Sequence, residues 1–174
     1  MTSLVQPDPE DGRTGSMRVA MVCLGNICRS PMAAKVGQAM ADDAGLGDRV
    51  TVESFGTAGY HVGGRADPAA VAALQRAGWP SDGHRARQIR AADIAAADIV
   101  LCADRANRRD VLSTAGDGRA AAKVRLLRLW DPTAAAEDEV PDPWGGGSEE
   151  FDRALRMIER ACRGLVDHLA ATLR

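Results

Sequence analysis

Cys23 and Arg29 stand at the two ends of a short stretch of chain that follows an apolar run and precedes a Ser-Pro pair. A cysteine thiolate is a nucleophile, and helix N-termini or adjacent cations lower the pKa of such thiols. A guanidinium presents a planar fork of N–H donors that matches the oxygens of an oxyanion. If the chain between them forms a tight loop, these two residues would hold an oxyanion directly beside a nucleophile.

The residues around this pair predict a strand, a loop and a helix. The run Val19–Val22 is short, apolar and nearly continuous, which is typical of a strand covered on both faces of a parallel sheet. Ser30 followed by Pro31 predicts a helix start, with the serine as the cap. Between the strand and the helix, Gly25 and Asn26 can adopt positive φ, so several backbone N–H groups can turn toward one point. Those donors and the positive helix end predict a cradle for an anion.

The spacing Cys-x5-Arg is not specific by itself, because Cys102 and Arg108 repeat it. The residues between this second pair include no glycine and predict a helix entry. We therefore expect Cys102 to be a buried structural thiol. Only the stretch that begins at Cys23 has strand, glycine, Ser-Pro and helix in the required order.

The segment Val22–Pro31, with the sequence VCLGNICRSP, resembles the signature of the low-molecular-weight protein tyrosine phosphatases. The resemblance extends over residues 17–172 and is most specific at this loop. It implies hydrolysis of an aryl phosphate, as in phosphotyrosine, through a cysteinyl-phosphate intermediate and without a metal or other cofactor. It assigns the nucleophile to Cys23 and phosphate binding to Arg29. The other residues that it implies in the phosphate-binding loop are Leu24, Gly25, Asn26, Ile27, Cys28 and Ser30.

Two aspartates in the long loop over residues 130–147 are candidates for the acid that this reaction needs, since Asp131 and Asp142 each precede a proline. Their positions in the chain do not decide between them. The resemblance favours Asp142, because the family places its acid in an Asp-Pro-aromatic segment before the last helix, as in residues 142–145 (DPWG). Asp142 would protonate the departing oxygen and then activate water as a base. Asp131 is expected to begin the turn after the fourth strand.

The loop over residues 56–64 is punctuated by glycines and holds Tyr60, the one tyrosine of the chain. An aromatic side chain beyond a strand end could form the wall of a pocket for a flat substrate. Alternatively, it packs down as an anchor of its own loop. The resemblance supports the pocket, because the family places an aromatic residue against the substrate ring at this position. Trp144 would face Tyr60 across that pocket.

Ser54 lies near the carboxyl end of a predicted strand over residues 49–55. Ligands bind outside the carboxyl ends of strands in open parallel sheets, so Ser54 would stand beside the Cys23 loop unless it is an ordinary strand hydroxyl. His84 is a lone histidine, which is more often structural than catalytic. The resemblance implies a shell that supports the backbone geometry of the phosphate loop, formed by Asn26, Ser30, Ser54 and His84.

Strand-like and helix-like segments alternate along the chain. After the opening run, strands are predicted over residues 49–55, 97–102 and 123–129. Helices are predicted from Pro31 to a stop at Gly45, over residues 68–77, from Asp104 through Leu112, and onward from a cap at Ser148. This alternation predicts an α/β fold, a single doubly wound domain over residues 17–174 with a four-stranded parallel sheet flanked by helices. Residues 1–16 are rich in Pro, Gly, Asp and Thr and predict a mobile tail.

A chain of 174 residues with a net charge of −2 is long enough for one domain and carries no broad basic field. We therefore expect neither nucleic acid nor an anionic membrane as a partner. No apolar run resembles a signal peptide or a membrane span. Four cysteines without a Cys-x2-Cys pair and three histidines argue against a zinc site and for reduced thiols in the cytoplasm. The expected partners are tyrosine-phosphorylated proteins, and the chain is expected to be a monomer with at most weak self-association.

Three alternative functions share parts of this pattern. Arsenate reductases of the same fold need a relay of further cysteines, and Cys102 is in a comparable place, but Arg108 and Arg109 stand where a partner thiol would be expected. Protein arginine phosphatases resemble this loop with threonine at the position of Ile27, and Ile27 favours the aryl phosphate. A non-catalytic module that binds phosphoproteins would use most of the same groups, although the intact nucleophile, arginine and acid argue against it.

Regulation by oxidation is implied at Cys28, which lies five residues from Cys23. Enzymes that this chain resembles form a reversible disulfide at such a pair under peroxide. Otherwise Cys28 fills space under the loop. The segment 142–145 lacks the tyrosines that are phosphorylated in some members of the family, so regulation by that route is not expected.

Overall fold

The strand β1 (Met17–Cys23) lies at the centre of the sheet and pairs in parallel with β2 (Val50–Gly56) on one side and β3 (Ile99–Cys102) on the other. β4 (Val124–Leu126) pairs in parallel with β3, so the strand order is β2-β1-β3-β4. This architecture comes from a computed structural model that describes residues 15–173. The predicted four-stranded parallel sheet is confirmed.

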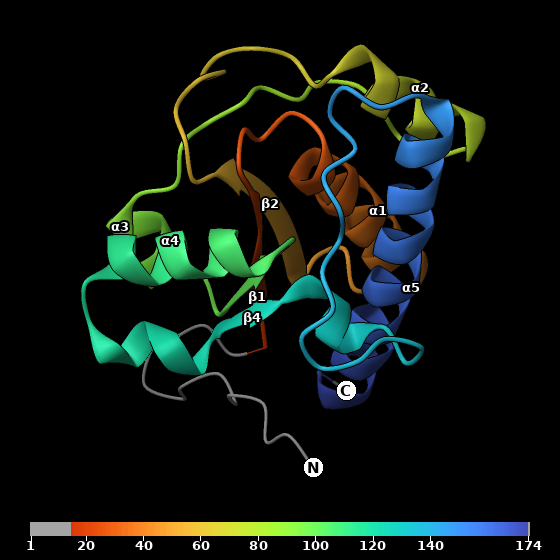
Figure 1. The fold of residues 1–174 in the computed structure, drawn as a ribbon. Coiled ribbons are helices and arrows are strands. Elements are labelled where there is room, and N and C mark those ends of the chain that lie inside the picture. The colour runs from red at the N-terminus through yellow and green to blue at the C-terminus, as the bar shows by residue number, and fades with distance from the viewer. Residues whose placement is uncertain (1–14, 174) are drawn as a thin grey trace.

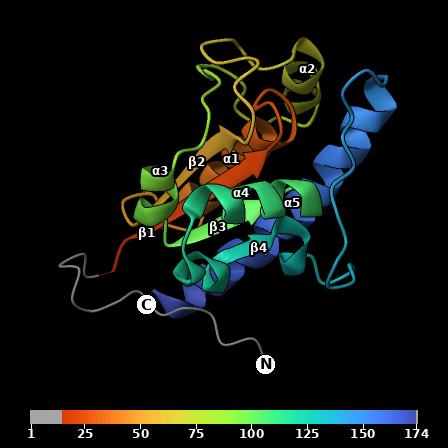
Figure 2. The same cartoon turned by 60° about the vertical axis from the view of Figure 1, so that its left-hand side comes forward.

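Helices cover both faces of this sheet, as predicted for a doubly wound α/β domain. They are α1 (Arg29–Asp43), α2 (Pro68–Arg76), α3 (Ala91–Ala96), α4 (Arg105–Ala115) and α5 (Ser148–Thr172), with the 3-10 turns η2 (Gly118–Ala122) and η3 (Leu127–Trp130). α1 and α5 pack together on one face, and α3 and α4 lie on the other (Figures 1 and 2). α3 was not predicted, because a helix of six residues is too short to show an apolar period. The predicted mobile tail falls almost wholly outside the described residues and stays a prediction.

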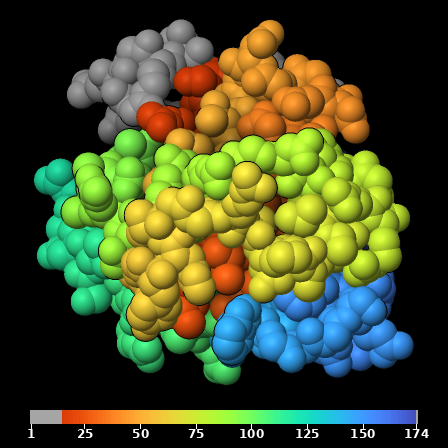
Figure 3. All heavy atoms as spheres, turned by 90° about the horizontal axis from the view of Figure 1, so that it is seen from above, coloured from red at the N-terminus to blue at the C-terminus, as the bar shows by residue number. Residues whose placement is uncertain are grey.

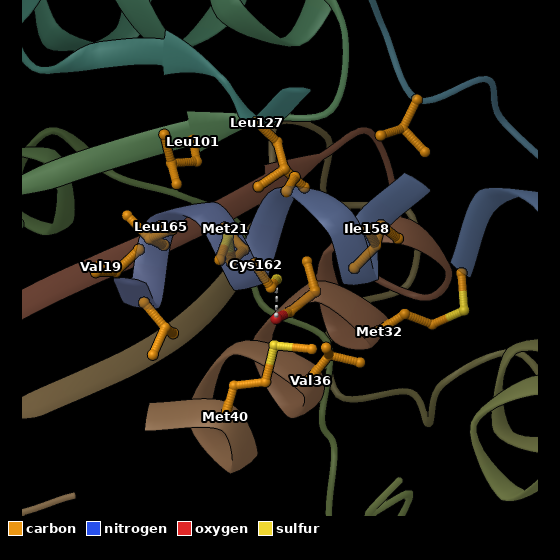
Figure 4. Close-up of a cluster of buried hydrophobic side chains, with 14 of the residues drawn as sticks. Val19, Met21, Met32, Val36, Met40, Leu101, Leu127, Ile158, Cys162 and Leu165 are labelled. Atoms are coloured by element: carbon orange, nitrogen blue, oxygen red, sulfur yellow. Dashed lines mark hydrogen bonds between the residues drawn. The ribbon is translucent and has the colours of Figure 1, made fainter. Parts of the chain in front are cut away.

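β1 explains why this sheet is buried on both faces. Side chains alternate along a strand, so Val19, Met21 and Cys23 point into the cluster beneath α1 and α5, whereas Ala20 and Val22 point into the cluster beneath α3 and α4. None of the five is more than 3% exposed. Figure 4 shows the first cluster, which gathers Met21 with Met32, Val36, Ile158, Cys162 and Leu165.

The helix that follows the phosphate loop begins at Arg29 rather than at the predicted Pro31. Cys28 occupies the cap position, and no side chain caps this end. The prediction of Ser30 as the cap is therefore wrong. Its hydroxyl is used inside the loop, where it donates to the carbonyl oxygen of Phe55 at 3.1 Å. Local partners of this kind compete with capping for a serine hydroxyl.

β4 is shorter than the predicted strand over residues 123–129, because the chain leaves the sheet after Leu126 and forms η3. η3 packs against α5 at Gly164. A Cβ atom at Gly164 would lie 2.0 Å from the carbonyl oxygen of Trp130. Glycine therefore permits a helix contact that replaces the end of the predicted strand.

α5 is the longest helix, with 25 residues, and it buries one face against α1. Ser148 is its first residue rather than its cap, so the predicted cap is wrong. The carboxylate of Glu150 instead accepts a hydrogen bond from the N–H of Gly147 at 2.9 Å. Glu149 and Glu150 lie in the first turn, as expected for the positive end of a helix. No helix in the described part of the chain is long and apolar enough to cross a membrane.

Candidate active site

The phosphate-loop residues run from the end of β1 to the first turn of α1, beside the end of β2. The N–H of Thr57 donates to the carbonyl oxygen of Cys23, and the N–H of Ala58 donates to that of Leu24, both at 2.9 Å. Gly56 lies directly against this loop, and a Cβ atom there would be 2.7 Å from the carbonyl oxygen of Leu24. The two strand ends thus fix the position of the loop, and only glycine fits at the contact.

The loop leaves its backbone donors free. Within residues 15–173, the N–H groups of Leu24–Cys28 donate to no protein acceptor. Asn26 has a φ of 57°, the one non-glycine residue in the described chain with positive φ. A left-handed residue inside a tight turn allows successive N–H groups to converge, which makes an anion-binding concavity. The loop and the N-terminus of α1 therefore suit a bound phosphate.

Asn26 is fully buried, and its polar atoms hold this strained conformation. Its Nδ2 donates to the hydroxyls of Ser30 at 2.9 Å and Ser54 at 3.0 Å. Its Oδ1 accepts the backbone N–H of Arg87 at 2.9 Å. The Nε2 atom of His84 lies 2.6 Å from its carbonyl oxygen. The structure thus brings together all four residues that the sequence analysis placed in a supporting shell.

His84 contributes to this shell as a neutral ring that donates from Nε2. Burial lowers its pKa, an effect that the hydrogen bond to the carbonyl oxygen of Asn26 partly offsets, and the charges of Lys35 and Arg87 lower it further. A neutral ring with its proton on Nε2 satisfies the Asn26 carbonyl. The histidine therefore lies behind the loop and does not line the pocket in front of it.

Cys23 and Arg29 face the same pocket. The Sγ atom of Cys23 lies 3.0 Å from the Oγ atom of Ser30. The Nη1 atom of Arg29 donates to Asp104 at 2.8 Å and to the carbonyl oxygen of Val140 at 2.9 Å. Its Nε atom is buried without a hydrogen-bond partner in the described chain. The guanidinium is thus anchored through one nitrogen and keeps donors available for a ligand.

Asp142 lies at the mouth of this pocket and Asp131 does not. One carboxylate oxygen of Asp142 accepts the N–H of Trp144 at 3.1 Å, and the other lies 3.7 Å from Nη2 of Arg29. The side chain of Asp142 is 45% exposed. Asp131 is buried and accepts hydrogen bonds from Thr133 within its own turn. Its position agrees with the predicted structural role.

The pocket between these groups has a volume of about 240 Å³. Tyr60 and Trp144 both line it, and they are 76% and 66% exposed, so they stand at its rim. In Figure 3 the red-orange loop residues form the floor of a hollow between the ochre segment near residue 60 and the blue segment near residue 144. An open pocket with aromatic side chains at the rim can admit a flat ring carried on a larger molecule.

Three residues of this site were not predicted from the sequence. His61 lines the pocket, and its ring lies against Gly25, where a Cβ atom would be 3.0 Å from its Cδ2. Asp104 and Val140 position Arg29. Asp104 follows the carboxyl end of β3. Ligands bind outside the carboxyl ends of parallel strands, so the same rule that was applied to Ser54 could have predicted Asp104.

The other cysteines are held as thiols. Burial and the nearby carboxylate of Asp67 raise the pKa of Cys28, which lines the pocket. Burial raises the pKa of Cys102, and burial raises the pKa of Cys162 to about 12. Cys102 is fully buried at the end of β3, as expected for a structural thiol. Within the described chain, only Cys28 accompanies Cys23 at the pocket.

Solved structures of phosphatases share this fold. A protein tyrosine phosphatase from Entamoeba histolytica, crystallised with Hepes in its active site, superposes with a TM-score of 0.83 and is 30% identical, covering 88% of this chain and 97% of that one. The YwlE arginine phosphatase superposes with a TM-score of 0.79 and is 29% identical, covering 88% of this chain and 95% of that one.

The sequence comparisons identify the family. The model described as low molecular weight phosphotyrosine protein phosphatase matches residues 18–174. A low molecular weight protein-tyrosine-phosphatase from Streptomyces coelicolor is 46% identical over 150 residues, which are 86% of this chain and 91% of that protein. The chain therefore belongs to the low molecular weight phosphotyrosine protein phosphatase family.

Proposed function

We propose that the protein hydrolyses phosphotyrosine, and aryl phosphates in general, with Cys23 as nucleophile. The observation that supports this most is the convergence of three groups on one pocket: the Cys23 thiol, the Arg29 guanidinium and the free N–H groups of the loop. Asp142 lies at the mouth of the same pocket. A phosphoryl group bound in this pocket would have hydrogen-bond donors around its oxygens, and the sulfur of Cys23 would lie next to its phosphorus.

In the first step, the thiolate of Cys23 attacks phosphorus, the S–P bond forms and the P–O bond to the aryl group breaks. The loop donors and the free edge of Arg29 stabilise the charge on the phosphoryl oxygens. Asp142, in its protonated form, donates its proton to the departing phenolic oxygen. Its half-exposed position at the rim suits this role, because the leaving group points outward from the loop.

In the second step, the Asp142 carboxylate accepts a proton from water, and that water attacks phosphorus. The S–P bond breaks, inorganic phosphate leaves and Cys23 returns to its thiolate form. The hydroxyl of Ser30 lies 3.0 Å from Sγ, and by turning its proton away from the carbonyl oxygen of Phe55 it can donate to the departing thiolate. The shell around Asn26 keeps the loop donors aimed at phosphorus through both steps.

Tyr60 and Trp144 would contact the substrate ring on its two faces. Their exposure means that they can cover a phosphotyrosine that projects from a protein surface. We therefore propose tyrosine-phosphorylated proteins as the partners and the cytoplasm, where such proteins occur, as the location.

The structure offers little for the arsenate reductase alternative. A relay would need a second reactive thiol that can reach Cys23 and then pass oxidation onward. Cys28 shares the pocket with Cys23 and could serve as the second thiol. Cys102 and Cys162 are fully buried and have raised pKa values, so neither is poised to pass oxidation onward from there.

Turnover of p-nitrophenyl phosphate by the wild type, Cys23→Ser and Asp142→Asn tests the proposal. We expect no turnover above background from Cys23→Ser and strongly reduced turnover from Asp142→Asn. Retained turnover in Cys23→Ser would end the proposal. Binding of phosphotyrosine peptides without any turnover by the wild type would favour the binding module, and reduction of arsenate with a thiol reductant would favour the reductase.

A further inference from the structure

Arg65 and Arg85 lie on two backbone segments that run side by side next to the active-site loops. The N–H of Gly63 donates to the carbonyl oxygen of Ala86, and the N–H of Ala86 donates to that of Gly64, both at 2.8 Å. Arg65 follows Gly64, and Arg85 precedes Ala86. This backbone pairing therefore holds the two arginines next to each other.

Both arginines line a groove of about 460 Å³. Its other titratable lining residues are His84 and Asp82. Burial lowers the pKa of His84, so its ring adds little positive charge at neutral pH. Two guanidinium groups against one carboxylate leave the groove with a net positive charge, on a chain whose overall charge is negative.

The guanidinium groups of Arg65 and Arg85 have no protein partner among residues 15–173. Neither Arg65 nor Arg85 makes a hydrogen bond or ion pair with its side chain inside the described range. Arg87, two residues further on, contrasts with them: it donates to the carboxylate of Glu53 at 3.1 Å and lies over the ring of Phe55 at 4.2 Å. The groove thus holds two guanidinium groups against the single carboxylate of Asp82, and this excess of positive charge favours an external anion.

The groove is close to the substrate pocket. Tyr60 lines the pocket and Arg65 lines the groove. Arg65 lies five positions after Tyr60 in the chain, so their backbones are at most about 18 Å apart. On the far side of Arg65, the N–H of Asp67 donates to the carbonyl oxygen of Ile27 in the phosphate loop at 2.8 Å. In Figure 3, the yellow segment that follows residue 65 borders the same red-orange floor as the ochre segment.

We propose that Arg65 and Arg85 form a second anion subsite, which binds a carboxylate or phosphate group that the substrate carries near its phosphotyrosine. The proposal rests on the proposed function. Guanidinium groups bind both kinds of oxyanion through paired N–H donors. The distance between the pocket and the groove limits how far this second group can be from the phosphotyrosine. An extended peptide covers the same distance per residue as the chain from Tyr60 to Arg65, so the second group lies within about five residues of the phosphotyrosine.

The test compares three phosphotyrosine peptides of the same length, which carry glutamate, phosphoserine or glutamine at the positions two to five residues on either side. The enzyme forms are the wild type, Arg65→Ala/Arg85→Ala and the matched control Arg119→Ala/Arg163→Ala. The control removes the same charge from exposed arginines on η2 and α5, away from the groove. p-Nitrophenyl phosphate, which is too small to reach the groove, reports the intact active site.

We expect the wild type and the control to favour the anionic peptides over the glutamine peptide about five-fold in kcat/KM at low salt, with the preference falling as salt rises. The groove variant should lose this preference and keep its turnover of p-nitrophenyl phosphate. Preference for glutamate, phosphoserine or both would define the anion that the subsite binds. Three results would overturn the subsite. The wild type could show no preference for the anionic peptides, the groove variant could keep that preference, or the control could lose it as fully as the groove variant does. Failure of the wild type to turn over p-nitrophenyl phosphate would instead count against the proposed function.

Discussion

The guanidinium of Arg29 is held from behind by the carboxylate of Asp104, with Nη1 and Oδ2 2.8 Å apart. The Arg29 side chain is 4% exposed and that of Asp104 20%, so this ion pair is largely shielded from solvent. A charge-assisted hydrogen bond of this kind fixes the orientation of the guanidinium plane. It leaves Nε and Nη2 as the edge that can meet a phosphate.

Removing the charge from Asp104 should therefore misplace Arg29. For Asp104→Asn we expect a fall in kcat/KM for p-nitrophenyl phosphate of about ten- to a hundred-fold, since misplacement of a binding group by about 1 Å can cost that much. Inorganic phosphate should also inhibit the variant less strongly, because the same edge of Arg29 binds it. Steady-state kinetics with phosphate as an inhibitor measure both effects.

The control for this variant is Asp110→Asn on the same helix, α4. In the described part of the chain, the carboxylate of Asp110 pairs only with Arg109, and both side chains are exposed. Its loss should leave kcat/KM and phosphate inhibition within about two-fold of the wild type, since exposed ion pairs contribute little. Equal losses in the two variants would show that the effect comes from the helix and not from Arg29.

Asp131 should stabilise the fold in a pH-dependent way. Burial alone would raise its pKa, but hydrogen bonds from Thr133 and from Arg160 and Arg128 outweigh burial and lower the pKa to about 2. Because the folded pKa lies below the ordinary value of 3.8, this stabilisation is present above about pH 4 and is lost as the pH falls toward 2. For Asp131→Asn we expect a loss of about 2 kcal/mol in the free energy of unfolding at pH 7, shrinking below pH 4.

Urea unfolding at pH 7 and pH 3 measures this difference. Asp43→Asn, an exposed site at the end of α1, serves as the control and should change the free energy of unfolding by no more than about 0.5 kcal/mol. A loss for Asp131→Asn that stays the same at both pH values would contradict the assignment of a depressed pKa.

The central parts of the site could be predicted because they lie close together in the chain. Cys23, the loop and Arg29 occupy seven consecutive positions, so strand, glycine and helix signals report on their geometry directly. Asp104 lies 75 residues from Arg29, and its local signal was that of a helix cap. It is both: Oδ1 accepts the N–H of Asn107 while Oδ2 holds Arg29. Sequence patterns show the local role of such a residue and hide the distant one.

The errors in the predicted elements have the same origin. Ser30 followed by proline is a strong capping signal, yet its hydroxyl turns to Asn26 and Phe55 because the fold brings them within reach. The apolar run after Leu126 suits a strand, but the contact of η3 with Gly164 of α5 bends it out of the sheet. In both cases a tertiary contact outweighs a correct local preference.

Trp144 should contribute to the recognition of an aryl group. For Trp144→Ala we expect kcat/KM for p-nitrophenyl phosphate to fall about three- to ten-fold, the size of one lost aromatic contact, with little change for an alkyl phosphate. Val62→Ala is the matched control, because Val62 is 61% exposed and does not line the pocket. A Trp144→Ala variant that loses aryl and alkyl turnover equally would contradict an aromatic wall.

Treatment with peroxide should lead to a disulfide between Cys23 and Cys28. Peroxide oxidises the Cys23 thiolate to a sulfenic acid, and the Cys28 thiol then condenses with it, forming the disulfide and releasing water. Because burial and Asp67 raise the pKa of Cys28, we expect the condensation to be slow at neutral pH and faster at alkaline pH. Dithiothreitol should restore activity in the wild type but not in Cys28→Ser after prolonged oxidation. Inactivation that dithiothreitol cannot reverse, with no Cys23–Cys28 peptide by mass spectrometry, would count against the disulfide.

The covalent intermediate on Cys23 can be observed directly in Asp142→Asn. p-Nitrophenolate leaves readily without a proton, so the first step should survive this substitution, whereas the second step loses the base that activates water. Rapid mixing with p-nitrophenyl phosphate should give a burst of p-nitrophenolate equal to the enzyme concentration, and acid quenching should yield a phosphorylated peptide that contains Cys23. Steady turnover with neither a burst nor a phosphorylated Cys23 peptide would contradict the cysteinyl-phosphate mechanism.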